Sequence, residues 1–355
     1  MKKKIAIIGA GWFGCHLASE ILKNKKFELK VYEKEKDIFR GASSNNQNRL
    51  HLGFHYPRSK LTRVQSKKGY KKFIKKYRFL CSKVKNNIYS IANDKDTHLD
   101  FETFCQIMKS EGLKFKKINA EKKFNICNVA GSLKTNEMLI NDVKSKNYFK
   151  NKLKRYLVLN STVRKISKDK GKYRINNEYF DYVINCTYYQ SFVNQSSRIF
   201  YEVTSSLIYK NKKYFPALTI MDGPYFTIYP YQKNYYNIYS VKHSRFKKSN
   251  NINNCIKLLK KVKNNNSQLI RKKKLIEKEI LKFCPDFKKN FKFAKYLNCI
   301  RTINNTNYAD RSFKVYYNKR MINIFSGKID HIISAGEEIL NYLKKNIKIL
   351  LHLHL

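Results

Sequence analysis

Three glycines near the start of the chain have the spacing that phosphate binding requires. Gly9, Gly11 and Gly14 follow a short apolar run, residues 4–8, and precede a helical pattern that continues through Leu22. The first glycine permits a tight strand-to-helix turn, the second lets backbone N–H groups approach a pyrophosphate, and the third lets helix and strand pack closely. The N-terminus of the helix would add partial positive charge beside the phosphates. We therefore expect a phosphate-binding turn here.

An acidic residue completes this pattern. Glu33 ends a second apolar run, residues 29–32, at 33 − 14 = 19 positions past Gly14, where a carboxylate at the tip of a strand reaches ribose hydroxyls. Trp12 and Phe13 lie between the glycines and belong to the same predicted site. The pattern predicts a dinucleotide site. The alternative, a glycine-rich surface turn with a solvated glutamate, would not explain why strand, glycines, helix, second strand and acid occur together. It does not distinguish NAD from FAD, since both expose an adenosine diphosphate.

Residues 39–55 combine small, hydroxyl and amide side chains with arginine and histidine, which is unusual for a surface loop. Placed after the βαβ unit, their Gly-Ala-Ser-Ser-x-Asn stretch resembles the FAD-dependent oxidoreductases of the D-amino-acid oxidase and glycine oxidase type. The resemblance implies FAD as the cofactor, with Ser43 and Ser44 on the phosphates and with Asn48 and Arg49 close to the isoalloxazine ring. An ordinary loop rich in Asn and Ser is the alternative.

A second part of the resemblance lies at residues 157–187, where a strand, a hairpin and a β-branched strand follow one another. This order is similar to the second half of an FAD-binding Rossmann domain. The resemblance implies that Val163 lies near the adenine and that the turn at Thr187 closes over the nucleotide. Tyr188 and Tyr189 follow this turn, where the family has glycine. An ordinary hairpin followed by a sheet strand is the alternative.

The C-terminal part supplies an arginine for substrate binding. Arg301 lies on a predicted strand, residues 296–302, and Asp310 and Arg311 follow it. The order strand, Arg, loop, Asp, strand, Gly and helix resembles the C-terminal signature of the same family, which implies that Arg301 clamps a substrate carboxylate. A planar guanidinium binds a carboxylate through two parallel hydrogen bonds and stays charged when partly buried. The alternative is a structural ion pair, with Asp310 as its partner.

The next turn is implied to contact the cofactor. Gly327, Lys328 and Ile329 connect the predicted strand 321–325 with a predicted helix over about residues 331–343. In the family this helix points its N-terminus at the flavin ring. We therefore expect these three residues to lie at the flavin.

The remaining segments predict the elements that must position these residues. Helices are expected over residues 61–91, over 135–157 and, as a pair, over 250–283, and a strand-rich stretch over 201–246. The predicted fold class is α/β, with a Rossmann-like FAD-binding domain and a substrate domain built on a mainly antiparallel sheet. The FAD-binding domain is expected at residues 1–90, 135–198 and 312–355, and the substrate domain at 91–134 and 199–311.

The composition is strongly basic, with 75 Lys and Arg against 25 Asp and Glu and a formal charge of +50. Such a balance usually indicates a nucleic-acid or anionic membrane partner. The lysines are scattered, however, and accompany much Asn, Ile, Tyr and Phe, the residues that A/T-rich codons encode. We therefore expect a solvated basic surface and no specific nucleic-acid partner. No run approaches the roughly 18 apolar residues that span a bilayer. Eight dispersed cysteines without a CxxC pair predict reduced thiols, a cytoplasmic location and no metal site.

These observations predict an FAD-dependent oxidoreductase that oxidises a C–N or C–O bond of a small anionic substrate by hydride transfer to flavin N5. A flavin-dependent nucleotide-sugar enzyme similar to galactopyranose mutase is an alternative, since several arginines could bind a diphosphate. The non-strand segment 40–60 argues against a nicotinamide-dependent dehydrogenase. A nucleic-acid-binding protein would need its basic residues on one face. His51, His55, Tyr229 and His243 are candidates for polar contacts near the ring. Neither the substrate, the electron acceptor nor the oligomeric state is predicted.

Overall fold

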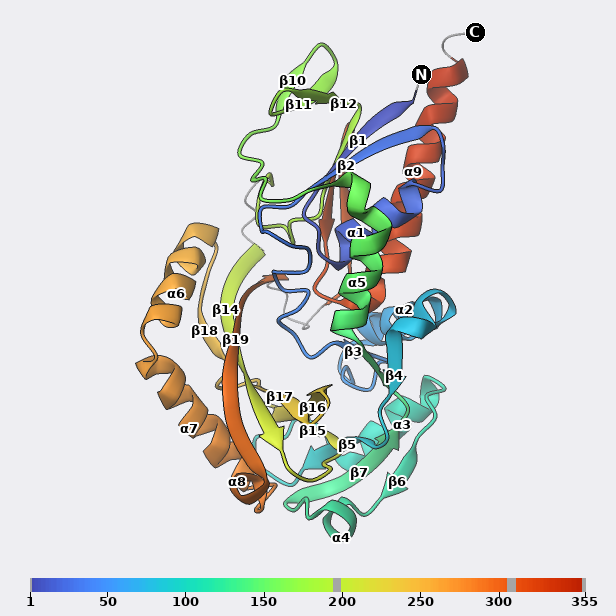
Figure 1. The fold of residues 1–355 in the computed structure, drawn as a ribbon. Helices are drawn as coiled ribbons and strands as arrows, with labels where there is room; N and C mark the ends of the chain where they lie inside the picture. Colours follow the sequence, from blue (N-terminus) through green and yellow to red (C-terminus); the bar gives the residue numbers. More distant parts are fainter. Residues whose placement is uncertain (1, 194–198, 305–310, 353–355) are drawn as a thin grey trace.

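Two large β-sheets dominate the structure, a computed structural model that describes residues 2–193, 199–304 and 311–352, with side chains described up to residue 346. One sheet is mainly parallel and lies in the upper half of Figure 1, and the other is mainly antiparallel and lies in the lower half. The predicted α/β fold class is confirmed. The division into two domains with the boundaries given above stays a prediction.

The parallel sheet is assembled from strands that are far apart in the sequence. In spatial order its strands are β20 (Lys314–Asn318), β21 (Met321–Phe325), β13 (Tyr182–Asn185), β1 (Lys3–Ile8), β2 (Phe27–Tyr32) and β9 (Leu157–Val158). All neighbours run parallel except β20, which pairs antiparallel with β21. Ile5, Ala6 and Ile7 of β1 are fully buried, because a central parallel strand is covered on both faces.

Helices cover one face of this sheet and a small meander covers the other. The helices are α1 (Trp12–Ile21), α5 (Asp142–Leu153) and α9 (Ile332–His352). The meander comprises β10 (Ser167–Asp169), β11 (Lys172–Ile175) and β12 (Glu178–Phe180). Ile5 and Ile7 join the core under the helices, whereas Ile8 joins the core under the meander, because successive strand side chains point to opposite faces.

The second sheet provides a broad wall. Its main path is β18 (Arg245–Ser249), β14 (Ile199–Asn211), β17 (Tyr235–Ser240), β16 (Phe226–Gln232), β15 (Ala217–Met221), β5 (Asn87–Ala92), β7 (Val129–Thr135) and β6 (Lys116–Ile118). A further strand, β19 (Phe291–Asn304), pairs antiparallel with β14 along its whole length. The β15–β5 pair runs parallel, and the other pairs run antiparallel.

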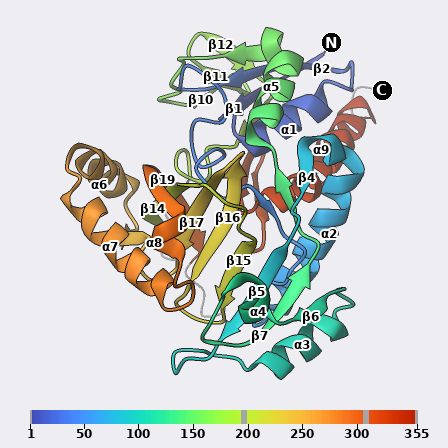
Figure 2. The ribbon, with the colours of Figure 1, turned by 60° about the horizontal axis from the view of Figure 1, so that its bottom comes forward.

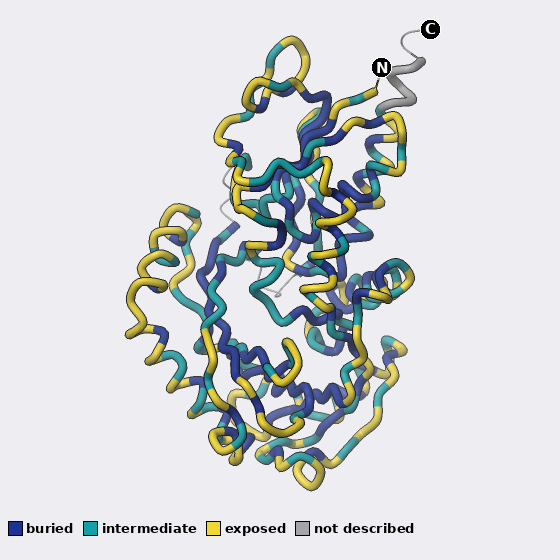
Figure 3. Tube along the Cα trace, in the orientation of Figure 1, coloured by how far each residue is buried: buried dark blue, intermediate teal, exposed yellow. Residues whose placement is uncertain are grey.

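Helices α6, α7 and α8 cover one face of this wall, and short helices lie at its far end (Figure 2). The first three are α6 (Ile252–Asn264), α7 (Ser267–Leu281) and α8 (Phe287–Asn290), and the others are α3 (Phe101–Ser110) and α4 (Ala120–Phe124). Val203 and Leu207 of β14 are buried on the helix side, so the alternate residues of this strand face the other way. Figure 3 shows that β14 is buried while the outer sides of α6 and α7 are exposed. The predicted strand-rich stretch and helical pair are confirmed.

A third, short sheet lies between the two large ones (Figure 1). It consists of β3 (Arg49–Leu50), β8 (Met138–Ile140) and β4 (Cys81–Lys83). The helix predicted over residues 61–91 is wrong in its second half, since α2 (Lys60–Tyr77) ends at Tyr77 and β4 and β5 follow. All residues of β5 are buried between β15 and β7. Pairing within the sheet therefore outweighs the helical spacing of the apolar residues there.

Two more predicted boundaries are wrong. The helix predicted from residue 135 begins at Asp142, because the Asn141 side chain accepts a hydrogen bond from the backbone N–H of Lys144 at 2.9 Å and caps it. The strand predicted over 157–166 ends at Val158, and Asn160 beyond it has a φ of +52°, which interrupts an extended chain. The predicted strands at 296–302 and 321–325 are present within β19 and β21.

The described part of the chain contains no helix long and apolar enough to cross a membrane. All eight cysteines are free. Within the same described residues, no group of three or more His, Cys, Asp or Glu side chains is arranged to hold a metal ion.

Candidate active site

A cleft of about 1310 Å³ runs from the glycine turn after β1 to the face of the second sheet that the helices leave open. The site residues predicted from the sequence line it, with the exception of Gly14: Gly9, Gly11, Trp12, Phe13, Glu33, Ser43, Ser44, Asn48, Arg49, Val163, Thr187, Arg301, Gly327, Lys328 and Ile329. The fold therefore brings segments from the beginning, middle and end of the chain into one cleft. The binding roles of the individual residues stay predictions.

The glycine turn has no space for side chains. Gly9 has a φ of +99°, and a Cβ at this position would lie 2.8 Å from the carbonyl oxygen of Cys186. A Cβ on Gly14 would lie 1.9 Å from the carbonyl oxygen of Gly9. Gly14 thus serves the close packing of α1 on the turn, which explains why it does not line the cleft.

Ser43 covers the N-terminus of α1. The backbone N–H of Trp12 donates to Ser43 Oγ at 3.1 Å, and a Cβ on Gly11 would lie 2.8 Å from the same oxygen. Ser44 Oγ donates to Asp142 Oδ1 at 3.1 Å, at the start of α5. Small polar groups therefore surround the helix N-terminus, in a space that any side chain on residue 11 would fill. These residues fit a pyrophosphate, which needs backbone N–H donors and close approach.

The carboxylate of Glu33 braces the same turn. Its Oε2 accepts a hydrogen bond from the backbone N–H of Ala10 at 2.8 Å, and its Oε1 accepts one from Glu35 at 3.1 Å. Glu33 lines the cleft near Val163, which is also buried. A carboxylate has four lone-pair sites, so Glu33 can hold the glycine turn and still accept hydrogen bonds from ribose hydroxyls.

Two tyrosines occupy the turn where the sequence departs from the resembled family. Tyr188 and Tyr189, which follow Thr187, have φ values of +62° and +59°, a conformation that is uncommon for residues other than glycine. The carbonyl oxygen of Tyr188 accepts a hydrogen bond from Thr302 Oγ1 at 2.5 Å. The hydroxyl of Tyr188 lies 3.3 Å from the place that a Cβ on Gly327 would occupy. Both tyrosines thus adopt a backbone conformation typical of glycine, and the hydrogen bond from Thr302 of β19 holds the turn in place.

Arg49 lies at the centre of a buried polar network. Its Nη1 donates to Thr219 Oγ1 at 3.0 Å, and its Nη2 donates to Tyr89 Oη at 2.7 Å and contacts Glu137 Oε2 at 3.3 Å. The guanidinium carbon lies 4.4 Å from the ring centroid of Tyr229. Arg49 Nε is buried and has no hydrogen-bond partner. Most of the guanidinium therefore fastens β3 to the second sheet, and Nε is left for another group.

Glu137 is the carboxylate of this network. Besides Arg49 it accepts hydrogen bonds from Tyr89 Oη at 2.6 Å and from the backbone N–H of Leu52 at 2.7 Å. Burial alone would raise the pKa of Glu137, but the neighbouring imidazole of His51, the charge of Arg49 and the hydrogen bond from Tyr89 outweigh it and hold the pKa well below its usual range. The carboxylate therefore stays ionised inside the protein and fixes the segment that follows β3.

Two histidines of that segment line the cleft. The ring centroids of His51 and His55 lie 5.6 Å apart, and His51 Nδ1 lies 3.8 Å from Glu137 Oε1. Burial lowers the pKa of both histidines, and the charge of Lys328 for His51 and of Arg49 for His55 adds to this effect. Both imidazoles are therefore neutral near pH 7 and able to accept a proton. Of the other polar candidates, Tyr229 packs beneath Arg49 and His243 lies outside the residues that line the cleft.

Arg301 forms an ion pair across two strands. It lies directly opposite Glu202 of β14 in the β14–β19 register, and its Nη2 donates to Glu202 Oε2 at 2.5 Å. Its guanidinium carbon lies 5.3 Å from the ring centroid of Tyr239, and its Nε is buried with no hydrogen-bond partner. Asp310, the partner considered from the sequence, lies outside the described residues. Arg301 thus combines an ion pair with a free donor in the cleft.

The turn before α9 is anchored by Lys328. Its Nζ donates to Ser66 Oγ at 2.7 Å, lies 3.4 Å from Asp330 Oδ2, and sits 3.9 Å from the ring centroid of Tyr56. A 3-10 turn, Ile329–His331, separates this lysine from α9. Lys328 is therefore a buried cation held between the turn at Gly327 and α2.

Sequence reasoning missed several residues of this site. Glu137, Glu202, Tyr56 and Tyr239 all contact or approach the predicted arginines and lysine, yet none belongs to a local motif. Glu202 and Arg301 are 99 positions apart, and only the strand register pairs them. Alternating aromatic residues on a predicted sheet were the one signal available for Tyr239.

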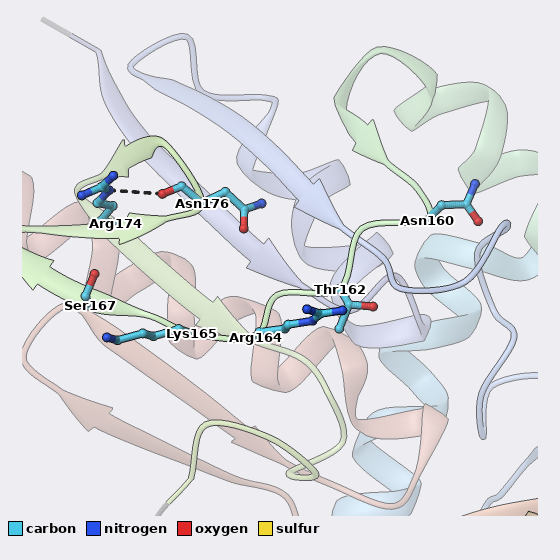
Figure 4. A pocket seen from close by; sticks show the side chains of 7 residues that line it. All are labelled: Asn160, Thr162, Arg164, Lys165, Ser167, Arg174 and Asn176. Carbon is cyan, nitrogen blue, oxygen red and sulfur yellow. Dashed lines mark hydrogen bonds between the residues drawn. The ribbon is translucent and has the colours of Figure 1, made fainter.

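A second, smaller pocket lies beside the meander (Figure 4). It has a volume of about 610 Å³ and is lined by Asn160, Thr162, Arg164, Lys165, Ser167, Arg174 and Asn176. Arg174 Nε donates to the carbonyl oxygen of Asn176 at 3.2 Å. All these residues except Ser167 are exposed. Burial therefore does not distinguish this pocket from the rest of the basic surface.

The comparisons with known proteins agree with this geometry. A family model described as FAD dependent oxidoreductase, DAO, matches residues 4–309. The FAD-dependent monooxygenase FPY4 of Fusarium mangiferae is 33% identical over 340 residues, which cover 96% of this chain and 90% of that protein. The FAD-dependent monooxygenase kojA of Aspergillus flavus is 29% identical over 373 residues, which cover 95% of this chain and 84% of that protein.

Solved structures share the fold at low sequence identity. L-alpha-glycerophosphate oxidase from Mycoplasma pneumoniae, with FAD bound, has a TM-score of 0.71 and 15% identity, and the match covers 97% of this chain and 95% of that one. Glycine oxidase from Geobacillus kaustophilus has a TM-score of 0.67 and 12% identity, with the same coverage. These likenesses extend over both large sheets.

Proposed function

Because this chain belongs to the DAO family of FAD-dependent oxidoreductases, we propose that it oxidises a C–N or C–O bond of a small anionic substrate by hydride transfer to N5 of bound FAD. One observation carries the proposal. The same cleft is lined by a turn that fits a pyrophosphate, by Arg49 and Arg301, and by two neutral histidines. Cofactor binding and substrate chemistry would thus share one cavity.

The N-terminal residues would hold the adenosine diphosphate part of the cofactor. Backbone N–H groups around Gly11 and the hydroxyls of Ser43 and Ser44 would bind the phosphates, and Glu33 would bind the ribose. Asn48 and Arg49 would border the flavin ring from one side, and the turn at Lys328 from another. The buried partners of Arg49 and Lys328 support this assignment, because groups that are already fixed lose little freedom on binding.

Arg301 would bind the anionic group of the substrate. Its ion pair with Glu202 keeps the guanidinium in place, and its unpartnered Nε–H is available as a donor. A charge-assisted hydrogen bond contributes roughly 1.5–3 kcal/mol. We therefore expect Arg301→Ala to raise KM or to slow flavin reduction by about ten- to a hundredfold while flavin content is kept.

A neutral histidine would remove the proton that must leave as the C–N or C–O bond is oxidised. His51 has one ring nitrogen directed at the Glu137 carboxylate, at 3.8 Å, so its other nitrogen, Nε2, is the proposed proton acceptor. Glu137 would stabilise the imidazolium that forms. His51→Gln should lower the rate of flavin reduction and remove a step from its pH profile.

The experiment is anaerobic reduction of the purified flavoprotein by a panel of compounds. The panel contains amino acids, N-methyl amino acids, hydroxy acids and nucleotide sugars, and the loss of the visible flavin absorbance is followed. Bleaching by one anionic class, with weaker response in Arg301→Ala, is the expected result. Purified protein without flavin, or a protein that only neutral or cationic compounds reduce, would contradict the proposal.

Oxygen transfer is the second candidate, because curated relatives that match almost the whole chain are described as FAD-dependent monooxygenases. In that reaction one atom of O₂ enters the product and the other leaves as water, at the expense of an added two-electron donor. Turnover in ¹⁸O₂ with and without a reduced nicotinamide separates the two. Labelled product that forms only with the donor favours oxygen transfer, and unlabelled product with hydrogen peroxide favours oxidation.

A further inference from the structure

The pocket beside the meander is distinguished by the charge that gathers in it (Figure 4). Arg164, Lys165 and Arg174 line it, and within the residues that the structure describes none of the three has a carboxylate at ion-pair distance. The remaining lining side chains carry hydroxyl or amide groups: Asn160, Thr162, Ser167 and Asn176. Three cations therefore share one hollow of about 610 Å³ with neutral hydrogen-bonding groups.

The linker between β9 and β10 presents two of these cations. Val163 and Ile166 pack into the core under the meander, and Arg164 and Lys165 between them are exposed. The apolar residues on either side fix the course of the chain. Both cations are therefore carried by a segment that is anchored before and after them.

The third cation is placed by the register of the meander. Arg174 of β11 lies directly opposite Ser167 of β10. Its Nε donates to the carbonyl oxygen of Asn176 at 3.2 Å, and its Nη2 donates to Asn177 Oδ1 at 3.4 Å. Both acceptors are neutral, so they hold the guanidinium in place without compensating its charge.

The acidic residues of the same segment are engaged elsewhere. Residues 157–187 contain three, Asp169, Glu178 and Asp181. Asp169 accepts a hydrogen bond from Tyr179 Oη at 2.6 Å. Glu178 pairs with a lysine of β2 at 2.6 Å, and Asp181 pairs with a lysine of β1 at 3.5 Å. Positive charge that is gathered in a hollow and left uncompensated attracts anions from solution.

We propose that this pocket binds a small phosphorylated ligand that bears at least two phosphate groups, at a site separate from that of the flavin. The volume lies within the range of about 300–1,000 Å³ that small-molecule sites occupy. One phosphate monoester carries roughly −1.5 to −2 charges at pH 7, so three cations match two phosphates. Arginine binds phosphate oxygens through its planar fork, and lysine binds them as a point charge. No aromatic side chain lines the pocket, so the phosphates carry the recognition.

The site adjoins the cofactor cleft without overlapping its phosphate-binding turn. Thr162 lines both the pocket and the cleft, whereas Arg164, Lys165 and Arg174 line the pocket alone. The phosphorylated ligand therefore binds while FAD stays in place, and flavin-loaded protein is the correct sample for the test.

Inorganic pyrophosphate and orthophosphate serve as probes, since the ligand is unidentified. Each is titrated into the flavin-loaded protein by calorimetry at constant ionic strength, and the flavin content is measured after gel filtration. Pyrophosphate should bind more tightly than orthophosphate and leave the flavin content unchanged. Arg164→Gln and Arg174→Gln should each weaken pyrophosphate binding by about two- to fivefold, as expected for exposed charge pairs, and the double variant by about the product of the two.

Lys172→Gln is the matched control. Lys172 is an exposed cation on the same strand and the same face as Arg174, because the two are two positions apart, but it lies opposite Asp169 and does not line the pocket. This variant should bind pyrophosphate normally.

Four results would each overturn the inference. They are no pyrophosphate binding by the wild-type protein, an equal loss in Lys172→Gln and Arg174→Gln, release of flavin by pyrophosphate, and duplex DNA that binds more tightly than pyrophosphate and is lost in the double variant. The second result would assign the binding to the basic surface in general, the third to the cofactor cleft, and the fourth to a nucleic acid.

Discussion

The contact between Gly14 and Gly9 leads to a quantitative prediction. A Cβ on residue 14 would lie 1.9 Å from the carbonyl oxygen of Gly9, whereas ordinary contacts begin at 3.4 Å. In Gly14→Ala, α1 would therefore have to move by about 3.4 − 1.9 = 1.5 Å relative to the turn. Overpacking typically destabilises a core by about 1–3 kcal/mol. We expect the upper end of this range, because the obstacle is a backbone atom that cannot rotate away.

The same displacement would move the N–H groups at the start of α1 away from the phosphates. Gly14→Ala should thus lose FAD as well as stability, which urea denaturation of the flavin-free protein and flavin content after gel filtration measure separately. Gly41→Ala is the control, since a Cβ there meets no atom within 4 Å. Equal stability of the two variants in the flavin-free state, with full flavin retention in Gly14→Ala, would refute the argument.

Four further predictions follow from the same structure. Glu33→Ala removes the hydrogen bonds from the backbone N–H groups of Ala10 in the glycine turn and of Glu35, together with the proposed ribose contact. FAD should therefore bind more weakly in a fluorescence titration, whereas unchanged affinity would remove Glu33 from the site. Glu137→Gln leaves the buried Arg49 uncompensated and should lower the free energy of unfolding by about 3–5 kcal/mol, and a loss in urea denaturation below about 1 kcal/mol would contradict its role in the network. Burial lowers the pKa of His16 from 6.5 to about 3, so the unfolded chain takes up the proton first and the free energy of unfolding falls from pH 6.5 towards pH 3. His16→Gln should make this fall shallower in urea denaturation. The same dependence of the free energy of unfolding on pH in the variant would contradict this role of His16. Duplex DNA should bind weakly and without sequence preference and dissociate as salt is raised to physiological levels, whereas a sequence-selective complex at that salt would favour a nucleic-acid function.

The glycine turn could be predicted because its physical requirements are local. Gly9, Gly11 and Gly14 lie within six positions. Their spacing is a local signal, although the atoms that crowd Gly9 and Gly11 belong to Cys186 and Ser43, far along the chain. FAD as the cofactor was implied by the family resemblance that this segment carries together with residues 41–46. Local chemistry of this kind is readable without knowledge of the sheet.

The inner end of the cleft could not be predicted in the same way. The partner of Arg301 is fixed by the register of β14 and β19, two long strands whose pairing no local spacing reveals. The second half of the predicted helix 61–91 failed for a related reason, because an apolar pattern of moderate length fits a helix or a buried strand until the neighbours of β5 are known. The caps at Asn141 and Ser59, by contrast, are local signals that mark the true starts of α5 and α2.

The order of the strands in the parallel sheet has a consequence for the synthesis of this protein. β1 and β2 leave the ribosome first, but β13, the neighbour of β1, pairs on its other side with β21, and α9 packs on α1. The strands of the second sheet all lie between residues 87 and 304, so their pairing can finish while the parallel sheet still lacks its last strands. We expect the nascent chain to remain unable to retain flavin until nearly all of it has emerged, which leaves the N-terminal strands dependent on chaperones in the interval.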